Sequence, residues 1–259
     1  MKGFVKRWLE GPVPDATTRE ARVDHGQRVY CIGDVHGRVD LLQELHRMIS
    51  RDAGAYEGQR TVVYLGDLID RGMRSREVVD LLLDEPLGGF ESVHLIGNHE
   101  QTLLDFLRYP TQAAGWLTWG GRETVLSYGV ALEPGLRTPD PEEVREALVA
   151  RIPDRHVDFF RSMRPYHTAG DYLFVHAGIR PGVPLQEQSD SDLLWIRNDF
   201  LASEEDHGCV VVHGHSISEQ VDERHNRIGI DTGAFRSGVL TCLVLEGNER
   251  RLLQTGGSG

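Results

Sequence analysis

Five short polar blocks constrain the fold of this chain most, because each stands directly after an apolar run with the length of a buried strand. In chain order they are Gly33-Asp34-Val35-His36-Gly37, Gly66-Asp67-Leu68-Ile69-Asp70-Arg71-Gly72, Gly97-Asn98-His99-Glu100, His176-Ala177-Gly178 and Gly214-His215. Open α/β sheets place their sites just past the carboxyl ends of strands, so we expect these blocks to lie close together. Their Asp, Asn and His side chains suffice for two divalent ions, which predicts a two-metal centre of the kind that hydrolyses phosphoesters.

Strand and helix signals alternate in the first half of the chain. Strand patterns at 28–33, 61–65 and 92–96 are each followed by helical periodicity, and Pro110 ends the third helix. Three such units in succession indicate βαβ crossovers and a mostly parallel sheet. The second half offers strand candidates at 172–175, 209–212, 227–230, 239–245 and 251–254 with few helices between them. That bias favours a second, more antiparallel sheet.

Composition limits the classes of function. The 259 residues carry 28 Lys and Arg against 40 Asp and Glu, a net charge of −12, which disfavours nucleic-acid binding. The three cysteines are widely spaced within strand patterns, so we expect buried reduced thiols. No run is apolar and long enough to span a membrane, and the first residues lack the apolar core of a signal peptide, so a cytoplasmic monomer is expected.

The blocks span the chain from end to end, which favours a single catalytic domain over 1–259. Residues 1–27 form an N-terminal extension in this division. Residues from about 111 to 165 form an irregular helical, cap-like insert that contains a Pro-rich acidic stretch at 134–143. Inserted loops vary while scaffolds persist, so we expect substrate choice to depend on this insert.

The five blocks in this order resemble the calcineurin-like metallophosphoesterases. More narrowly, they resemble the phosphoprotein phosphatase (serine/threonine protein phosphatase) branch in its short bacterial and phage form, from about residue 28 to about residue 246. The segments Trp195-Ile196-Arg197 and Ile230-Asp231-Thr232-Gly233-Ala234 also resemble the bacterial members. The resemblance implies an α/β fold (an α+β sandwich) of two mixed β-sheets flanked by helices, with a dinuclear metal site at the carboxyl ends of the strands.

The same resemblance implies the metal ligands. One ion would be held by Asp34, His36 and Asp67, and the other by Asp67, Asn98, His176 and His215. Asp67 can bridge the ions because its carboxylate has two oxygens. Asn98 ligates without adding charge, and Gly97 before it is expected to allow a sharp turn. Mn²⁺ is our first choice for both ions, and Fe, Zn, Ni, Co and Mg suit the same mixed oxygen and nitrogen ligands.

Four further residues receive catalytic roles. His99 follows a ligand directly and suits a general acid for the leaving group, because histidine titrates near neutral pH. By resemblance, Asp70 orients His99 and raises its pKa. Arg71 and Arg197 offer planar forks for phosphate, with Arg180 as a nearby rival of Arg197. In the third block, Glu100 is expected to support the site without reacting.

Two substrate hypotheses remain within direct in-line hydrolysis by a metal-bridging hydroxide. The first is a broad phosphomonoesterase acting on a phosphoprotein, a phosphopeptide or a small phosphomonoester. The alternative is a symmetrical bis(5′-nucleosyl)-tetraphosphatase or another nucleotide phosphohydrolase. That family usually shows GNHD and lacks the complete DRG, so Glu100 and the run from Asp70 to Gly72 favour the first hypothesis. A non-catalytic binding module would lack at least one ligand, and none is missing.

The last block separates phosphatases from diesterases. Many phosphodiesterases of the wider superfamily carry GHxH, with a second ligand two residues after the first. Ile217 occupies that position here, which favours the phosphatase arrangement. His213 is therefore expected to be a structural neighbour, although strand periodicity would place it on the same face as His215.

Overall fold

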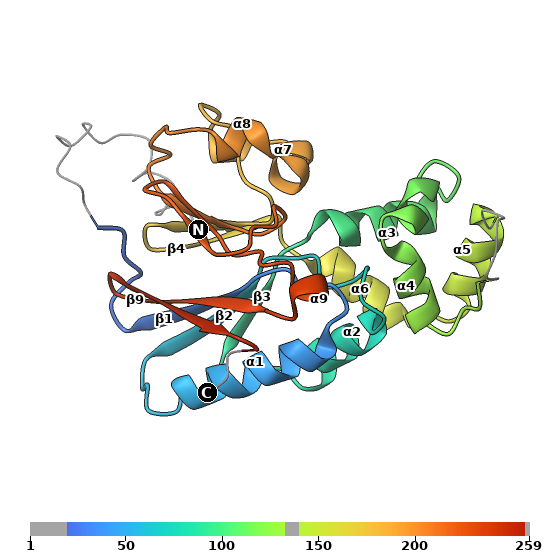
Figure 1. Cartoon of the computed structure of the whole chain (residues 1–259), viewed down its shortest axis with the longest axis horizontal. Coiled ribbons are helices and arrows are strands. Elements are labelled where there is room, and N and C mark those ends of the chain that lie inside the picture. Colours follow the sequence, from blue (N-terminus) through green and yellow to red (C-terminus); the bar gives the residue numbers. More distant parts are fainter. Residues whose placement is uncertain (1–19, 133–139, 257–259) are drawn as a thin grey trace.

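Two five-stranded mixed sheets pack face to face, with helices on the outer face of each (Figure 1). The computed structural model describes residues 20–132 and 140–256. The strands are β1 (Gln27–Ile32), β2 (Gln59–Tyr64), β3 (Glu91–His94), β4 (Tyr166–Ala169), β5 (Tyr172–Val175), β6 (Val210–His213), β7 (Asp222–Glu223), β8 (Arg227–Gly229), β9 (Thr241–Glu246) and β10 (Glu249–Gln254). The fold predicted from the sequence, two mixed sheets flanked by helices, is confirmed.

The first sheet has the strand order β10-β9-β1-β2-β3. Its strands β1, β2 and β3 are parallel and are joined through α1 (Val39–Asp52) and α2 (Ser75–Asp84), as the βαβ prediction requires. After β3 the chain enters α3 (Asn98–Arg108). The apolar faces of α1 and α2 pack on this sheet, so the loop after each parallel strand is held at the same edge.

The second sheet has the order β4-β5-β6-β8-β7 and corrects one prediction. We expected 239–245 and 251–254 to belong to this sheet, but β9 pairs with β1 and carries β10 into the first sheet. Each sheet therefore has two parallel and two antiparallel pairings, and the second is not the more antiparallel one. An apolar strand pattern reports burial, which both sheets offer, and not the partner strand.

Three apolar layers hold the sandwich together. The middle layer lies between the sheets and includes Val29, Val63, Phe174 and Val212. The layer beneath the first sheet is shared with α1, α2 and α3. The third layer packs Phe200 and its neighbours between the second sheet and the helices α7 (Asp190–Trp195) and α8 (Asn198–Leu201), beside the short η3 (Leu185–Glu187).

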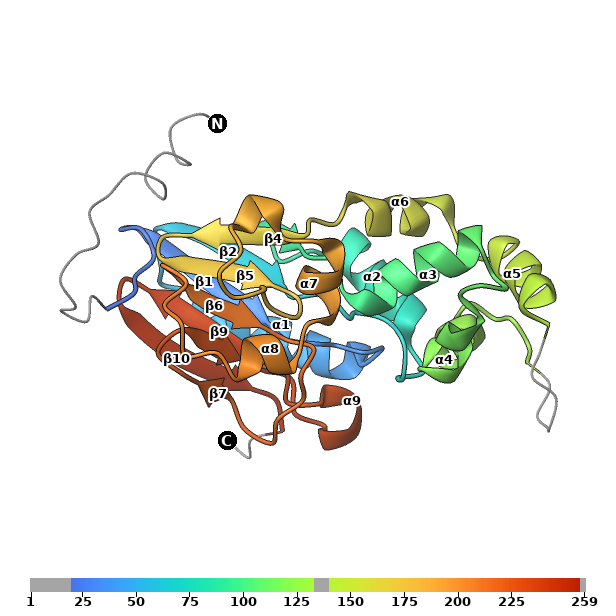
Figure 2. The same cartoon turned by 90° about the horizontal axis from the view of Figure 1, so that it is seen from above.

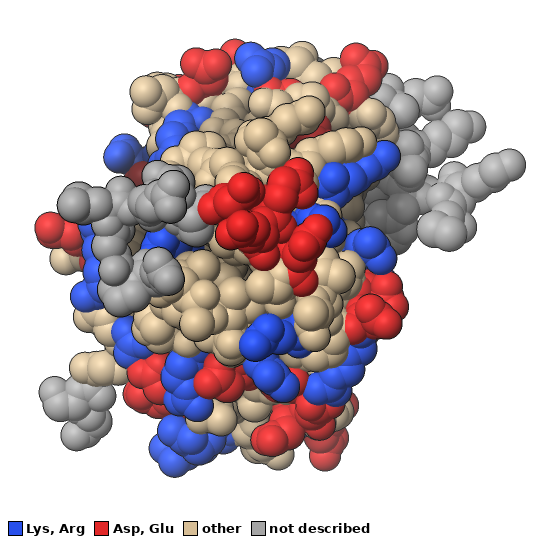
Figure 3. Space-filling view, turned by 90° about the vertical axis from the view of Figure 1, so that its right-hand side faces the viewer, with Lys and Arg blue, Asp and Glu red and all other residues tan. Residues whose placement is uncertain are grey.

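A group of helices extends from one end of the sandwich (Figure 2). The predicted helical stretch contains η2 (Ala114–Thr118), α4 (Gly121–Ser127), α5 (Pro141–Val149) and α6 (Asp154–Ser162); α9 (Ala234–Ser237) lies near the C-terminus. Acidic side chains gather on the face that carries α5 (Figure 3). The start of α5 is itself acidic, with Asp140 as its N-cap and Glu142 and Glu143 in its first turn. The rest of the predicted acidic stretch, at 134–139, and most of the N-terminal extension, at 1–19, lie outside the described residues.

The cysteines are free thiols, with Cys31 and Cys242 buried and Cys209 partly buried. Within 20–132 and 140–256, no helix is long and apolar enough to cross a membrane.

Candidate metal centre

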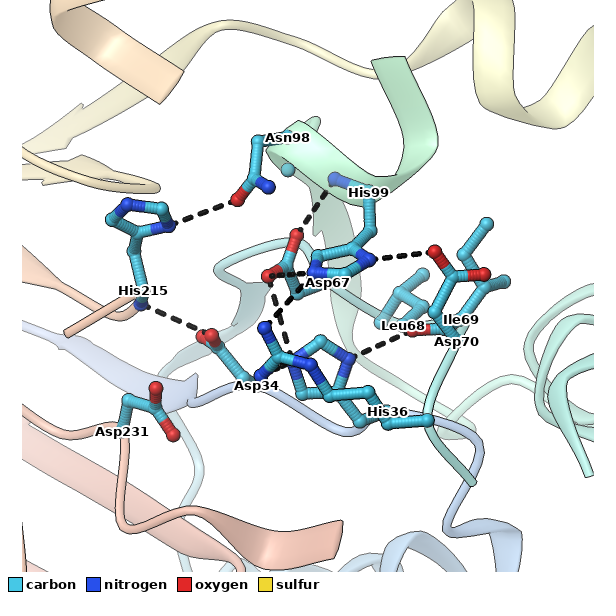
Figure 4. Close-up of polar contacts among 12 residues, drawn as sticks. Asp34, His36, Asp67, Leu68, Ile69, Asp70, Asn98, His99, His215 and Asp231 are labelled. Carbon is cyan, nitrogen blue, oxygen red and sulfur yellow. Dashed lines mark hydrogen bonds and ion pairs between the residues drawn. The ribbon is translucent and has the colours of Figure 1, made fainter. Parts of the chain in front are cut away.

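The six predicted metal ligands converge at one edge of the sandwich. Figure 4 shows all of them except His176. Asp34 and His36 follow β1, Asp67 follows β2, Asn98 opens α3, His176 follows β5 and His215 follows β6. All six side chains are buried. Two groups of possible ligands share Asp67: His36, Asp67 and His99 form one, and Asp67, His176 and His215 form the other.

Asp67 faces both groups, one with each carboxylate oxygen. Its Oδ2 lies 3.5 Å from Nε2 of His36, and its Oδ1 lies 3.4 Å from Nε2 of His176. Burial alone would raise the pKa of Asp67, but the surrounding histidines outweigh burial and hold the pKa well below its ordinary value. Asp67 is therefore an anion placed between two sets of nitrogen donors.

Backbone carbonyls fix the protonation of two of these histidines. Nδ1 of His36 lies 2.8 Å from the Ile69 carbonyl, and Nδ1 of His176 lies 2.9 Å from the Leu65 carbonyl. A carbonyl oxygen can only accept, so Nδ1 carries the proton in both rings and Nε2 presents a lone pair to the centre. Burial, as the largest cause, lowers the pKa of both, to about 3 for His36, so both rings are neutral.

The lone pair of His176 meets another acceptor with no proton between them, because its Nε2 lies 2.9 Å from Oδ1 of Asn98. Nδ1 of His215 lies 2.9 Å from the same oxygen, and the buried Nε2 of His215 has no hydrogen-bond partner among the described residues. The buried Oδ1 of Asp34 has no hydrogen-bond partner among the described residues. Acceptors that converge in this way are stabilised by a cation, and mixed oxygen and nitrogen donors without a thiolate suit Mn²⁺, Mg²⁺, Fe or Zn²⁺. The residues present fit two divalent ions.

Backbone strain is concentrated on the same centre. Among the described residues, the non-glycine positions with positive φ are His36 (46°), Asp67 (48°), Asp70 (73°), Arg71 (63°) and His215 (61°). Non-glycine residues rarely adopt this left-handed conformation, and it persists where surrounding contacts enforce it. The strain turns each side chain out of its strand direction and toward the centre.

Glu100 provides much of that enforcement from the first turn of α3. Its Oε2 accepts from the backbone N–H of Asp67 (2.8 Å) and of Gly97 (2.9 Å), and its Oε1 accepts from those of Leu68 (2.8 Å) and Ile69 (3.2 Å). Both oxygens act only as acceptors, which is the behaviour of the ionised form, although burial and Asp67 raise the pKa of Glu100 to about 7. Glu100 thus ties α3 to the loop after β2.

The glycine before Asn98 is required for a different reason from the one we expected. Gly97 has φ −97° and ψ 170°, an extended conformation open to any residue, so it makes no sharp turn. A Cβ at this position would instead collide with the backbone nitrogen and Oδ1 of Asp67. Gly97 therefore allows the two ligand loops to approach each other closely.

His99 and Asp70 are in direct contact, as their predicted roles require. Nδ1 of His99 lies 2.6 Å from Oδ2 of Asp70. Asp70 also accepts from Nε1 of Trp116 (2.7 Å) and from the hydroxyl of Thr124 (2.5 Å), so the helical stretch holds this carboxylate from behind. No local pattern in the sequence predicts these two supports, because they come from distant helices.

Electrostatics favour a protonated His99. Burial would lower the pKa of His99, but Asp67 and the hydrogen bond to Asp70 outweigh burial and raise the pKa to about 9. Arg71 donates to Nε2 of His99 (3.1 Å) and to Nε2 of His36 (2.9 Å). A protonated His99 has no lone pair at Nε2, so Arg71 must then turn away from it.

The two arginine candidates beside the second sheet differ in their partners. Arg180 is engaged by Asp192, with its Nε 2.8 Å and its Nη2 2.6 Å from Oδ1. Arg197 is exposed, and no ion pair among the described residues includes its guanidinium. Its charge nonetheless helps to lower the pKa values of His176 and His215, after burial and other causes. Arg197 is therefore better placed than Arg180 to meet an incoming anion.

From the sequence we assigned no role to the carboxylate of Asp231 and predicted that His213 and His215 lie on the same face. Asp231, just beyond β8, is buried beside Asp34 (Figure 4), and burial, Asp67 and other neighbours set its pKa at about 6. An Asp directly after an apolar strand was the available signal. His213 does not share a face with His215: β6 ends at His213, which packs edge-on to Phe200, whereas the left-handed His215 turns toward Asn98.

A protein-family model matches most of the chain. The model described as calcineurin-like phosphoesterase matches residues 27–237. The chain belongs to this family. It is a metallophosphoesterase, and its family uses divalent metals of the kind that the two ligand groups can hold.

Two relatives and one solved structure that resemble this chain carry names that specify an activity. A symmetrical bis(5′-nucleosyl)-tetraphosphatase of Acidovorax ebreus is 34% identical over 154 residues, which are 59% of this chain and 44% of that protein. The asymmetrical bis(5′-nucleosyl)-tetraphosphatase PrpE of Bacillus thuringiensis is 24% identical over 236 residues, covering 82% of this chain and 88% of that protein. A solved structure described as a candidate diadenosine tetraphosphatase has a TM-score of 0.61 at 22% identity, covering 93% of this chain and 100% of that one. The last likeness shows the fold.

These relatives change the order of our two substrate hypotheses. The motif variants favoured a serine/threonine protein phosphatase, and no comparison confirms that branch, whereas the named relatives are tetraphosphatases. The physical reason is that Asp70 and Arg71 contact His99, and Glu100 supports the loop after β2, which are contacts within the centre itself. Both substrate classes present a phosphoryl group to such a centre, so these residues do not distinguish them.

Proposed function

We propose that this chain hydrolyses a phosphoanhydride bond of dinucleoside tetraphosphates. The proposal rests on the names of the relatives: they are bis(5′-nucleosyl)-tetraphosphatases, and their alignments cover up to 82% of the chain. The local charge distribution supports it as well. On a chain of net charge −12, the centre gathers Arg71 and Arg197 beside two candidate cation sites, which suits a polyanionic substrate.

The proposed chemistry divides between the ions and the side chains. Two divalent cations, when bound, supply Lewis acidity to the phosphoryl group and lower the pKa of water. Arg71 has two guanidinium nitrogens that contact His36 and His99 in this structure. The first would become free for a phosphate oxygen when His36 holds an ion, and the second when His99 is protonated. His99, held through Nδ1 by Asp70, keeps Nε2 for a proton directed at the leaving oxygen.

One observation favours a second candidate, a phosphomonoester of an alkyl hydroxyl such as phosphoserine or phosphothreonine. The pair of His99 and Asp70 is complete and buried, with Trp116 and Thr124 fixing the carboxylate. A nucleotide leaves as a stabilised anion, whereas an alkoxide needs a proton as it departs. A well-built proton donor is therefore of greater use with an alkyl phosphomonoester.

A substrate panel on protein reconstituted with Mn²⁺ distinguishes the two candidates. The panel contains diadenosine tetraphosphate, a phosphoserine peptide, p-nitrophenyl phosphate and its diester. We expect the highest kcat/KM with the tetraphosphate. A higher kcat/KM with the phosphopeptide than with the tetraphosphate would refute the proposal and establish the second candidate.

The variant His99→Ala tests the proton donor on the same panel. We expect it to keep both metal ions and to lose about 10²–10⁴-fold in kcat with the phosphoserine peptide, the usual contribution of a general acid. The loss with p-nitrophenyl phosphate and with the tetraphosphate should be distinctly smaller, because these leaving groups depart without a proton. His225→Ala, at an exposed histidine, is the matched control. Equal losses on all substrates, or loss of a metal ion, would contradict the role of His99 as the acid.

A further inference from the structure

Two exposed tryptophans meet at the metal centre. Trp119 stands between η2 and α4 and is 56% exposed, and Trp195 ends α7 and is 41% exposed. Their ring centroids lie 6.4 Å apart with the planes at 72°. They come from opposite parts of the molecule, since η2 and α4 belong to the helical end and α7 lies over the second sheet (Figure 2). Large apolar surface left open to water at such a junction marks a binding site.

Trp195 contacts the metal centre directly, and Trp119 is linked to it through the neighbouring Gly120. The ring of Trp195 packs edge-on to His215, with centroids 6.3 Å apart and planes at 82°. On the other side, the Gly120 carbonyl next to Trp119 accepts from the backbone N–H of Arg71 at 3.0 Å. A Cβ on Gly120 would lie 2.7 Å from Cγ of Arg71, so the segments around Gly120 and Arg71 pack too closely for any residue larger than glycine. The pair therefore spans the mouth of the centre from His215 to Arg71.

A cleft that contains an exposed arginine adjoins Trp195. It measures about 210 Å³ and is lined by Trp195, Arg197 and residues of α7 and α8, including the carboxylates of Asp192 and Asp199. Arg180 lines the same cleft, but its guanidinium is bound to Asp192, which leaves Arg197 as the cation of the cleft that is open to a ligand. Phosphate at the centre and an aromatic surface beside it match the two ends of a nucleotide.

We propose that Trp119 and Trp195 form a stacking platform for a nucleobase of the substrate. This inference rests on the proposed function, because a phosphoserine peptide carries no planar ring next to its phosphate. A base can stack on a tryptophan whatever its hydrogen-bonding edge, so the platform binds adenine and guanine nucleotides alike. Neither tryptophan touches the reacting atoms, and both act on substrate affinity.

The test compares substrates with and without a base. Trp119→Ala, Trp195→Ala and the double variant are assayed on diadenosine tetraphosphate and on inorganic tripolyphosphate. We expect KM for the dinucleotide to rise about tenfold or more with little change in kcat, in line with the usual contribution of a stacked base. Kinetic constants for tripolyphosphate should stay unchanged, and Trp119→Phe and Trp195→Phe should keep most of the affinity. Equal losses on both substrates would overturn the proposal.

A binding measurement separates this inference from the proposed function. AMP and ribose 5-phosphate, which differ only in the base, are titrated calorimetrically into the wild-type protein loaded with Mn²⁺ and into the double variant. Tighter binding of AMP to the wild type, lost in the double variant, supports the platform even if the tetraphosphate is not hydrolysed. Equal affinity of the wild type for both ligands overturns the platform, including the case in which the tetraphosphate is hydrolysed.

Discussion

Asp67 joins the two halves of the metal centre, because each of its carboxylate oxygens faces a different group of histidines. Its left-handed backbone and the hydrogen bond from its amide to Glu100 hold it in that orientation. No other single residue belongs to both groups of possible ligands among those described. Any coupling between ions held by the two groups would thus depend on one side chain.

The variant Asp67→Asn tests this coupling at the scale of a residue. An amide offers one ligating oxygen and no charge, so we expect fewer than two bound ions per chain and loss of turnover. Metal content by elemental analysis and kcat on p-nitrophenyl phosphate provide the measurement. Asp158→Asn, at an exposed aspartate of α6, is the control and should bind two ions. Two tightly bound ions with near-normal turnover in Asp67→Asn would show that another group bridges them.

The elements are coupled through the start of α3. The helix begins with Asn98 and His99, and in the same turn Glu100 accepts three hydrogen bonds from the loop after β2 and a fourth from Gly97. A candidate metal ligand, the proposed acid and the residue that supports Asp67 therefore come from three consecutive positions of one element. The helix and the strand loop must form together for the centre to exist.

The variant Glu100→Gln measures the strength of that link. The amide nitrogen of Gln would face backbone N–H donors, so at least one donor is left without a partner, at a cost of about 1–3 kcal/mol. We expect a lower free energy of unfolding in a denaturant titration and weaker Mn²⁺ binding. Glu85→Gln, at an exposed position after α2, is the matched control and should behave as wild type. Unchanged stability and metal affinity would mean that the loop holds its conformation without Glu100.

A second coupling between elements is sensitive to pH. His46 of α1 hydrogen-bonds the Tyr64 hydroxyl (2.9 Å), and His94 of β3 stacks on the same tyrosine ring. Burial lowers the pKa of both histidines to about 4, from 6.5 in an unfolded chain. The unfolded state then binds protons that the folded state does not, so stability is retained above about pH 6.5 and is lost as the pH falls toward 4.

His94→Phe removes one of these two titrations and keeps an aromatic ring against Tyr64. We expect the free energy of unfolding to fall less steeply between pH 6.5 and pH 4 than in the wild type, measured with chelator present so that the metal ligands contribute equally. His225→Phe, at an exposed histidine, should leave the slope unchanged. Identical slopes for His94→Phe and wild type would show that His94 does not stay neutral in the fold.

At the scale of the whole molecule, the metal centre connects the two sheets. Asp34, His36 and Asp67 follow strands of the first sheet, whereas His176 and His215 follow strands of the second. Bound ions would therefore add bonds across the sandwich at the edge where the apolar layer between the sheets ends. Metal binding is expected to stabilise the whole fold as well as to enable the reaction.

Removal of metal should then lower the melting temperature together with the activity. A ligand that binds only the folded state adds about 2.7 kcal/mol when its free concentration is 100 times its Kd. We expect the melting temperature to fall after dialysis against chelator, and Mn²⁺ to restore both the melting temperature and hydrolysis of the tetraphosphate. Asp67→Asn should show a much smaller response to Mn²⁺. An unchanged melting temperature on full removal of the ions would show that they add no stability across the two sheets.

The sequence by itself determined the parallel units of the first sheet and the six candidate ligands. These features are local: an apolar strand reports its own burial, and the polar residue after it must lie at the strand end. The contact of Asp70 with His99, which lies 29 positions away, was expected only from the family resemblance. Tertiary structure decided the rest. It placed β9 and β10 in the first sheet, brought Asp231 beside Asp34, and set Trp116 and Thr124 behind Asp70. It also joined Trp119 to Trp195 across the mouth of the centre. Such pairings depend on which surfaces meet after folding, and residues far apart in the chain carry no local pattern that announces them.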